Sequence, residues 1–261
     1  MPEPAPASAS LVRETVYGSR KRLDWVLRHV TVEDRILELG CGTGYMLCRP
    51  LAKLGYRVHG IDLDRTSIQR GQELLRSEGL DPEVLSARPL AEVAERPSVI
   101  IASEVLEHLN DSELGPLLGE LHSRLDPGGR LLVTVPNGYG WFELEHFAWW
   151  KLRLGSLLFR SGFCHVIEKT KTRWLGPEAI TAGPPSTLAD SPHVQRFTLR
   201  GIRRRLEGAG FAVLEARGSV AVSGPFSNLF LAGVEPLLEA NGRYGDRLRG
   251  LASGFFLACR A

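Results

Sequence analysis

The 261-residue sequence is poor in cysteine, and the cysteines that it has are not spaced for metal binding. They are Cys41, Cys48, Cys164 and Cys259, and no two of them have the Cys-x-x-Cys spacing of a metal site. A chain of this length buries enough apolar surface to fold without disulfides. We therefore expect reduced thiols and a cytoplasmic location.

Long apolar runs and a strong net charge are also missing. The longest stretch without a charged residue, 218–234, is interrupted by Gly224 and Pro225 and is too short to span a bilayer. Residues 1–10 lack the basic and apolar regions of a signal peptide, so we expect a disordered tail there. The net charge of +2 gives no indication of nucleic-acid binding.

The most informative stretch that is present covers residues 36–46, Ile-Leu-Glu-Leu-Gly-Cys-Gly-Thr-Gly-Tyr-Met. A short apolar strand runs into a loop with Gly40, Gly42 and Gly44, and a helical pattern follows at once. Glycine permits backbone angles that a Cβ forbids, and it lets a ligand approach the main chain closely. An ordinary tight turn is the alternative, but three alternating glycines after a carboxylate favour a ligand-binding loop.

The spacing of these glycines also indicates which ligand the loop binds. A dinucleotide fingerprint, Gly-x-Gly-x-x-Gly, would need its third glycine at position 45, which is Tyr45. Glu38, just before the loop, would repel a pyrophosphate but suits a ligand that carries positive charge. A sulfonium with an amino-acid tail is such a ligand.

A second carboxylate follows the next predicted strand, residues 57–61. Asp62 stands at the carboxyl end of that strand, about 20 residues after the glycines, where an acidic residue accepts hydrogen bonds from two ribose hydroxyls. Capping of the next helix, predicted for 65–78, is the alternative role, but Asp64 is better placed to cap it.

Glu38 and the three glycines resemble the first motif of the class I S-adenosylmethionine-dependent methyltransferases, and residues 20–136 are similar to that family. The resemblance implies S-adenosylmethionine as the cofactor and S-adenosylhomocysteine as the product. It also implies an α/β, Rossmann-like fold whose seven-stranded sheet is mostly parallel with an antiparallel last strand, has helices on both faces and carries an inserted cap. The cofactor-binding residues that it implies are Glu38, Gly40, Cys41, Gly42, Gly44, Asp62, Leu63, Ser86, Ala87 and Ser103.

One position departs from the family pattern. The family often has an acidic residue near the end of its third strand to receive the adenine amino group, whereas this sequence has Ser86, Ala87 and Arg88. We expect backbone groups around Ser86 and Ala87 to supply this contact.

The rest of the chain fits an alternation of helices and strands, apart from two long interruptions. Pro50 should kink the first crossover helix or shift its start. The predicted helices are a lead-in helix between 11 and 30, 45–54, 65–78, a helix capped by Asp111 that reaches 125, and 199–207; the further predicted strands are 83–86, 98–102, 130–135, 211–217 and 254–260.

The segment 103–109, Ser-Glu-Val-Leu-Glu-His-Leu, follows the central strand 98–102. It resembles the Glu-Val-Leu-Glu-His signature of small-molecule methyltransferases, including ubiquinone-type O-methyltransferases. One helical turn over 104–108 would bring Glu104, Glu107 and His108 together. A carboxylate beside an imidazole favours proton uptake by the ring, so His108, assisted by Glu107, is the candidate general base. A purely structural hydrogen bond from His108 is the alternative.

Residues 137–195 are too many for a plain connection and predict an inserted cap or lid. Aromatic side chains and basic residues are dense in the 141–160 region. They suit an apolar acceptor pocket, a peripheral contact with a membrane surface, or a helix that covers the core. Residues 163–192 are rich in Gly, Pro, Thr and Lys and predict a mobile segment.

These features divide the chain into four parts: a tail (1–10), the cofactor-binding half of the methyltransferase domain (11–136), the cap (137–195), and the C-terminal part of the same domain (196–261) with a second insert at about 218–251. The resemblance implies transfer of a methyl group from S-adenosylmethionine to a small-molecule acceptor. We expect O-methylation of an apolar or natural-product-like acceptor, with N-methylation left open.

Three other interpretations remain. Glu104, Glu107, His108 and the distant His193 resemble the ligands of divalent-metal-dependent 2′-O-methyltransferases that act on RNA, although the balanced charge disfavours RNA and metal binding is not the preferred prediction. The chain could also be a noncatalytic S-adenosylmethionine-binding partner protein. An NAD-linked oxidoreductase is the fourth candidate.

Overall fold

The computed structural model describes residues 7–176 and 193–261. They form two compact units, which we call the core unit (residues 23–135, 193–216 and 256–261) and the insert unit (residues 7–22, 136–176 and 217–255). Positions 1–6 of the predicted tail and 177–192 of the predicted cap lie outside the described residues.

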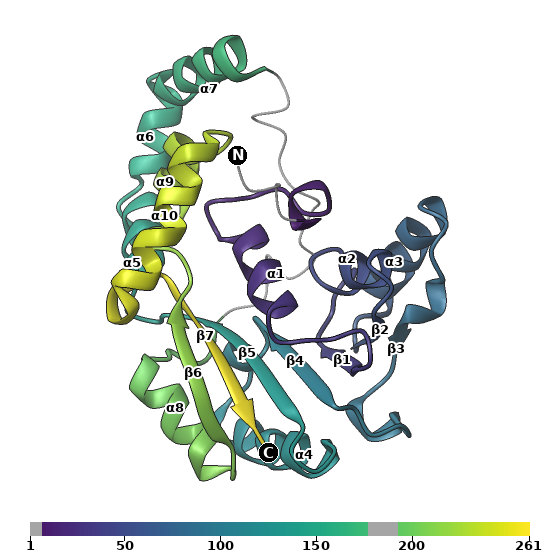
Figure 1. Ribbon diagram of the computed structural model, residues 1–261. Helices are drawn as coiled ribbons and strands as arrows, with labels where there is room; N and C mark the ends of the chain where they lie inside the picture. Colours follow the sequence, from purple (N-terminus) through teal and green to yellow (C-terminus); the bar gives the residue numbers. More distant parts are fainter. Residues whose placement is uncertain (1–6, 177–192) are drawn as a thin grey trace, which may run out of the picture. The chain divides into compact units, whose positions relative to one another are not determined.

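Seven strands form one sheet, in the order β3-β2-β1-β4-β5-β7-β6 (Figure 1). The first five strands pair in parallel, and β7 runs antiparallel to β5 and β6. The strands are β1 Arg35–Leu39, β2 Arg57–Asp62, β3 Leu85–Ala87, β4 Val99–Ser103, β5 Arg130–Pro136, β6 Ala212–Gly218 and β7 Gly254–Arg260. This arrangement confirms the predicted fold class.

The order of the strands places helices on both faces of the sheet. The chain first moves outward from β1 to β3 and then crosses back to β4 and β5. Since crossovers between parallel strands are right-handed, helices formed on the outward path and on the return path cover opposite faces. The helices are α1 Ser19–Leu27, α2 Cys48–Lys53, α3 Arg65–Ser77, α4 Asp111–Arg124, α5 Trp141–His146, α6 Leu154–Arg160, α7 Phe163–Leu175, α8 Leu199–Gly208, α9 Pro225–Leu231 and α10 Glu235–Arg247.

The core of the sheet is apolar and closed to solvent. In β4 the four residues 99–102 have no exposed surface, as expected for a central parallel strand that is covered on both faces. Trp25 of α1 is also fully buried, and its ring lies 5.2 Å from that of Phe256 in β7. Because β1 and β4 are parallel neighbours, they end at the same edge of the sheet, next to this buried core.

The entry to β1 is fixed by an ion pair at the other end of the strand. Arg130 donates to both carboxylate oxygens of Asp34, at 2.6 and 2.7 Å, and the Ser98 hydroxyl donates to the same carboxylate at 2.8 Å. Burial alone would raise the pKa of Asp34, but hydrogen bonds from Thr31 and Ser98 and the ion pair with Arg130 outweigh it and lower the pKa. These contacts hold the first residues of β1 in register with β4 and β5.

Two predicted helices and one segment that was predicted to be mobile differ from the observed structure. The lead-in helix is shorter than predicted, since α1 begins at Ser19. The first crossover helix begins at Cys48, so that Pro50 lies in its first turn, where a missing N–H costs little. The prediction of a mobile segment from residue 163 is wrong up to Leu175: α7 forms there because the chain has no Gly or Pro between Phe163 and Leu175.

The insert unit contains a string of helices, α5 to α7, with α9 and α10 beside them (Figure 1). Buried Glu145 of α5 accepts hydrogen bonds from the Trp141 indole and from the backbone and hydroxyl of Ser227 in α9. The Lys21 ammonium donates to the backbone carbonyls of Gly218, Ser219 and Gly242. Polar side chains therefore tie the separate segments of this unit together.

No helix within residues 7–176 and 193–261 is both long enough and apolar enough to cross a membrane.

Candidate functional site

The glycine loop after β1 adopts a conformation that requires glycine. Gly40, Gly42 and Gly44 all have positive φ angles, +66°, +54° and +66°. A Cβ on Gly40 would lie 2.5 Å from Cγ2 of Val105, whereas a Cβ on Gly42 would meet nothing within 4 Å. The loop is therefore packed tightly at its start, whereas at Gly42 there is space beside the backbone that a ligand could approach.

Glu38 reaches this loop from β1. Its side chain is buried, with 4% of its surface exposed, and Oε2 accepts a 3.0 Å hydrogen bond from the backbone N–H of Cys48, the first residue of α2. A carboxylate at a helix N-terminus is favoured by the orientation of the peptide dipoles. Glu38 thus fixes the first turn of α2 and places negative charge beside the glycine loop.

Asp62 reaches the same loop from the end of β2. Its Oδ2 accepts a 2.7 Å hydrogen bond from Gly42 N, and its Oδ1 accepts a 2.8 Å hydrogen bond from Asp64 N. Each carboxylate oxygen has two acceptor sites, so both keep capacity for a ligand hydroxyl. Leu63, the next residue, leaves 77% of its surface exposed and offers an apolar face beside this carboxylate.

Cys41 and Cys48 lie behind the loop. Their sulfurs would lie 2.8 and 2.5 Å from a Cβ on Gly60, so both thiols pack against β2. A hydrogen bond with Cys48 lowers the pKa of Cys41, but burial and the carboxylates of Glu38 and Asp62 outweigh it and raise the pKa above the usual value. Burial raises the pKa of Cys48 well above its usual value. Both cysteines are therefore neutral packing groups at physiological pH.

Ser86 and Ala87 lie on β3, beside Ile61 and Asp62 of β2. The Ser86 hydroxyl lies 2.8 Å from Nε2 of His59, and the Arg88 guanidinium lies 2.6 Å from the same nitrogen. Burial, followed by the positive charge of Arg88, lowers the pKa of His59. The Ser86 side chain is thus engaged within the protein.

Ser103 is the last residue of β4, and its side chain belongs to a series of hydrogen bonds that reaches β5. Its hydroxyl lies 2.9 Å from Oγ1 of Thr134, which in turn donates to Glu104 Oε1 at 2.8 Å. Glu104 has a left-handed backbone, with φ +56°, and its N–H donates to Thr134 O. Thr134 is therefore a site residue that the sequence reasoning missed, and its place in an apolar strand gave no signal.

The predicted helical turn over 104–108 is wrong in its extent. A 3-10 turn covers only Leu106–His108, because Glu104 is left-handed and Val105 packs against Gly40. Glu104 Oε1 instead accepts a hydrogen bond from Thr134, and Glu104 is not in the cluster that Glu107 and His108 form with His193. Val105 was also missed, although it connects this segment to the glycine loop.

Glu107, His108 and His193 come together in the core unit. Glu107 is buried, and its Oε1 lies 3.9 Å from Nε2 of His108. The rings of His108 and His193 meet edge to face with centroids 5.4 Å apart. One ligand atom from each of the three residues can be chosen so that all lie within 4.8 Å of one another.

The main chain explains how His193 reaches this place from so far along the sequence. The backbone N–H groups of Val194 and Gln195 both donate to Glu107 O, at 2.8 and 2.9 Å. The Gln195 side chain donates to Asp111 Oδ1, which also pairs with Arg205 of α8. Residues 193–195 are thus attached to the segment that carries His108.

These contacts also correct the predicted cap of α4. The N-cap is Asn110, whose side chain accepts from Ser112 N and Glu113 N in a capping box, and not Asp111. Asp111 is the first helical residue, and hydrogen bonds from Gln195 and Arg205 lower its pKa. Its role is to hold the chain that follows His193.

A family model matches most of the chain. Residues 20–216 match the family model described as a methyltransferase domain. Among curated proteins, the chain is similar to a ubiquinone biosynthesis O-methyltransferase from Brucella anthropi, with 35% identity over 105 residues that cover 40% of this chain and 41% of the relative. The matched segment thus spans about two fifths of the length of that relative.

Solved structures show the same fold. A magnesium protoporphyrin IX methyltransferase from Synechocystis with bound S-adenosylhomocysteine has a TM-score of 0.53 at 15% identity, covering 93% of this chain and 80% of the other. An S-adenosylmethionine-dependent methyltransferase from Mesorhizobium loti has a TM-score of 0.53 at 16% identity, covering 94% and 98%. The family model covers most of the sequence, the fold agrees with it, and so the chain belongs to the methyltransferase domain family, as predicted.

Proposed function

We propose that the protein transfers a methyl group from S-adenosylmethionine to the hydroxyl of a small-molecule acceptor. The observation that carries this proposal is the pairing of Glu38 and Asp62 on either side of the open glycine loop. Two carboxylates suit a ligand with an ammonium and a sulfonium group, as well as ribose hydroxyls. They do not suit the pyrophosphate of a dinucleotide.

The cofactor-binding residues belong to the same proposal. Asp62, held by Gly42 N, would receive the ribose hydroxyls, and exposed Leu63 would lie against the adenine face. Backbone groups at Ser86 and Ala87 would meet the adenine edge, while Gly40, Cys41, Gly44 and Ser103 would shape the walls. These residues lie on or follow four adjacent strands, β3, β2, β1 and β4, that end at one edge of the sheet, where open α/β folds bind ligands.

Thermal stability tests the cofactor directly. A ligand that binds only the native state raises the melting temperature, and a concentration of one hundred times Kd contributes about 2.7 kcal/mol. We expect stabilisation by S-adenosylhomocysteine and none by NAD. Stabilisation by NAD alone would refute the proposal in favour of the oxidoreductase.

For the chemistry, we propose that the acceptor oxygen attacks the sulfonium methyl in line. The oxygen–methyl bond forms as the methyl–sulfur bond breaks, the sulfur keeps the electron pair, and His108 takes the hydroxyl proton. Glu107, 3.9 Å from His108, would hold the ring and stabilise its charged form. The protein mainly aligns the two reactants and excludes water.

This role for His108 has a direct test. With hydroxyl acceptors such as simple and prenylated phenols, formation of S-adenosylhomocysteine would be measured for His108→Ala, with His165→Ala as an exposed control. We expect His108→Ala to lose roughly 100-fold or more in turnover and the control to lose nothing. If every acceptor stays unmethylated by the native protein while S-adenosylhomocysteine binds, the noncatalytic partner protein becomes the better proposal.

A second candidate is favoured by the meeting of Glu107, His108 and His193. Their ligand atoms lie close enough together to hold one divalent ion, although Glu104, the fourth predicted ligand, is held by Thr134. A bound ion would supply charge that lowers the pKa of the acceptor hydroxyl. One carboxylate and two imidazoles suit zinc or manganese better than magnesium.

The variant His193→Ala distinguishes the metal-assisted candidate from catalysis by His108 alone. If an ion assists the reaction, His193→Ala and chelation both abolish turnover, and added Mn²⁺ restores the chelated enzyme. If His108 acts alone, turnover is indifferent to chelators and His193→Ala changes it by no more than about twofold. An RNA acceptor is the less favoured form of the metal-dependent candidate, because the net charge of the chain is only +2.

Location and surroundings complete the proposal. All four cysteines are free and buried, which supports a reducing compartment such as the cytoplasm. We further propose an apolar acceptor and a peripheral membrane contact through the 141–160 region. An apolar acceptor would be most concentrated in the membrane, so this contact would bring the protein to it. Vesicle binding tests this contact.

A further inference from the structure

We propose that residues 141–175 of the insert unit form a docking surface for a bilayer that carries anionic headgroups. We call these residues the docking segment. The inference extends the 141–160 contact to α7 and adds selectivity for lipid charge. It rests on the proposed contact of residues 141–160 but requires neither methyl transfer nor a bound cofactor, so its test can fail while the proposed methyl transfer stands, and the reverse.

The first observation is the exposure of large apolar side chains. Twelve such residues are exposed within the docking segment, about half of those found among the described residues: Trp141, Leu144, Phe147, Trp150, Leu152, Leu154, Leu157, Phe159, Phe163, Val166, Trp174 and Leu175. Phe159 leaves 77% of its surface exposed and Trp174 leaves 81%. A concentration of this kind marks an interaction site, whereas single exposed apolar residues are ordinary.

The second observation is that the segment also has an inner side, so the exposure is not general. Trp149 packs against Gly155, where a Cβ would lie 2.4 Å from the indole, and its ring centroid lies 4.8 Å from that of Phe226 in α9. Its neighbour Trp150 leaves 62% exposed. Cys164 of α7 is buried, while Phe163 beside it is exposed. The helices therefore carry apolar residues on an inner side, which packs against the protein, and further apolar residues on a side that is exposed to solvent.

The third observation is charge. The docking segment contains six basic residues and three acidic ones: Lys151, Arg153, Arg160, Lys169, Lys171 and Arg173 against Glu143, Glu145 and Glu168. The resulting formal charge of +3 exceeds that of the whole chain, +2. Lys171 is partly buried and donates to the carbonyls of Asn228 and Ala232, so it attaches α7 to α9. The other five basic residues are exposed.

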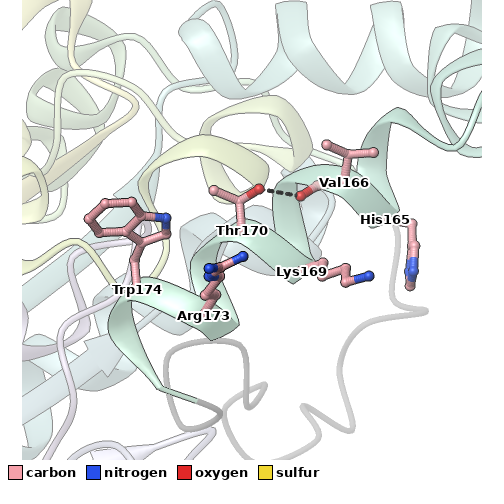
Figure 2. Close-up of a pocket in the computed structure, with 6 residues that line it drawn as sticks. All are labelled: His165, Val166, Lys169, Thr170, Arg173 and Trp174. Atoms are coloured by element: carbon pink, nitrogen blue, oxygen red, sulfur yellow. Dashed lines mark hydrogen bonds between the residues drawn. The ribbon is translucent and has the colours of Figure 1, made fainter.

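Figure 2 shows how apolar and basic groups alternate on α7. His165, Lys169 and Arg173 follow one another at four-residue intervals, and Val166, Thr170 and Trp174 form the adjacent row. These six residues line a shallow hollow along the helix. Rows of basic residues beside a tryptophan are suited to the interface of a bilayer, where long cationic chains reach the headgroups and the indole lies at their level.

The charge also decides between a bilayer and a second copy of the chain. In a symmetric dimer the same surface faces itself, so five exposed cations would oppose five others. Anionic lipid instead neutralises each of them, and a lysine or arginine near such a surface contributes about 1 kcal/mol. The docking segment therefore matches an anionic bilayer better than it matches itself.

Co-sedimentation with vesicles tests the inference, using the full chain without donor or acceptor. We expect binding to phosphatidylcholine vesicles that contain roughly one third phosphatidylglycerol, and at least about tenfold weaker binding to phosphatidylcholine alone. Raising the salt from about 0.1 M to about 0.5 M should weaken binding, because exposed charges are screened. Equal binding to both vesicle types, or binding to neither, would overturn the proposal.

Matched variants assign the binding to the segment. The double variant Trp150→Ser/Phe159→Ser should lose most of the binding, whereas Leu214→Ser, which alters a 60% exposed leucine in β6, should keep it. Lys169→Gln/Arg173→Gln should lose the preference for anionic vesicles, and Arg243→Gln in α10 should retain it. Unchanged binding in both segment variants refutes the proposal. A doubled mass of the native protein in light scattering, together with absent vesicle binding, would assign the surface to a second copy.

Discussion

The glycine loop of residues 36–46 and the docking segment use apolar residues in opposite ways. In the loop and its strand, Ile36 and Leu37 are buried to 3% exposure, and none of the residues 36–46 is fully exposed. In the docking segment, aromatic residues of similar hydrophobicity are mostly exposed. Apolar composition alone therefore does not determine burial, since the partners that surround each element decide it.

The two regions also differ in how they are held. Three residues hold the loop in place: Glu38 from β1, Asp62 from the end of β2 and Val105 from the segment after β4. The docking segment is attached chiefly along one side, through Glu145, Trp149 and Lys171. A change in the loop should therefore affect both stability and binding, while a change on the exposed side of the segment should affect neither folding nor the cofactor.

The largest effect is expected for Gly40→Ala. Its positive φ costs about 1 to 2 kcal/mol for alanine, and the clash with Val105 adds about 1 to 3 kcal/mol. Gly79→Ala is a matched control, because Gly79 has φ +72° but nothing within 4 Å of its Cβ position. Urea denaturation should show a loss of unfolding free energy about twice as large for Gly40→Ala, with loss of S-adenosylhomocysteine binding. Equal losses in the two variants would contradict tight packing of the loop.

The next effect is expected for Asp62→Asn. The variant keeps the size of the side chain but removes the charge and one acceptor oxygen. We expect affinity for S-adenosylhomocysteine to fall about tenfold, or about 1.4 kcal/mol, in calorimetric titration. Asp64→Asn is the control, because asparagine caps a helix as well as aspartate does and Asp64 lies only two residues away. A similar loss in both variants would remove Asp62 from the proposed site.

An effect of similar size, on stability and not on cofactor affinity, is expected for Asp34→Asn, which tests how the strand that carries the loop is held. The folded pKa of Asp34 lies below its unfolded value, so its stabilisation is complete above the unfolded pKa and is lost as the pH falls through the folded pKa. The variant should be less stable by about 1 to 2 kcal/mol at neutral pH, and the difference should narrow below about pH 4. Urea denaturation across this pH range provides the measurement, and a pH-independent difference would contradict the ion-pair role.

The smallest effect is expected on the other side of the comparison. Leu157→Ser and Phe159→Ser alter side chains that are 63% and 77% exposed, so each should change the unfolding free energy by no more than about 0.5 kcal/mol. Melting curves without lipid would measure it. A loss above about 1 kcal/mol would mean that these side chains pack against the protein, and the contrast between the two regions would fail.

Much of the core unit could be predicted because its signals are local. The strands at 57–61, 98–102, 130–135 and 254–260 differ from the observed ones by at most a residue at either end, since each is a short apolar run bounded by turn residues. The cap at Asp64 was also predicted correctly. The cap of α4 was not, because Asn110 and Asp111 are both good capping residues and only their contacts distinguish them.

The insert unit was less predictable. Its aromatic residues fitted a pocket, a membrane surface or a cover for the core, because periodicity identifies a helix but not what lies against each of its sides. The helix α7 was missed because the composition of 163–192 was averaged over a stretch whose first 13 residues form the helix. Composition over a long window conceals such a boundary.

The sequence by itself determined the family, the positions of most strands along the chain and the carboxylates beside the glycine loop, because each depends on neighbours within a few residues or on a spacing that one strand and one turn impose. Only the tertiary structure decided that Glu104 contacts Thr134 while His193 joins Glu107 and His108. It also decided that the aromatic residues of the docking segment are exposed. These contacts join residues that are far apart in the chain, and their distances depend on packing that local sequence does not specify.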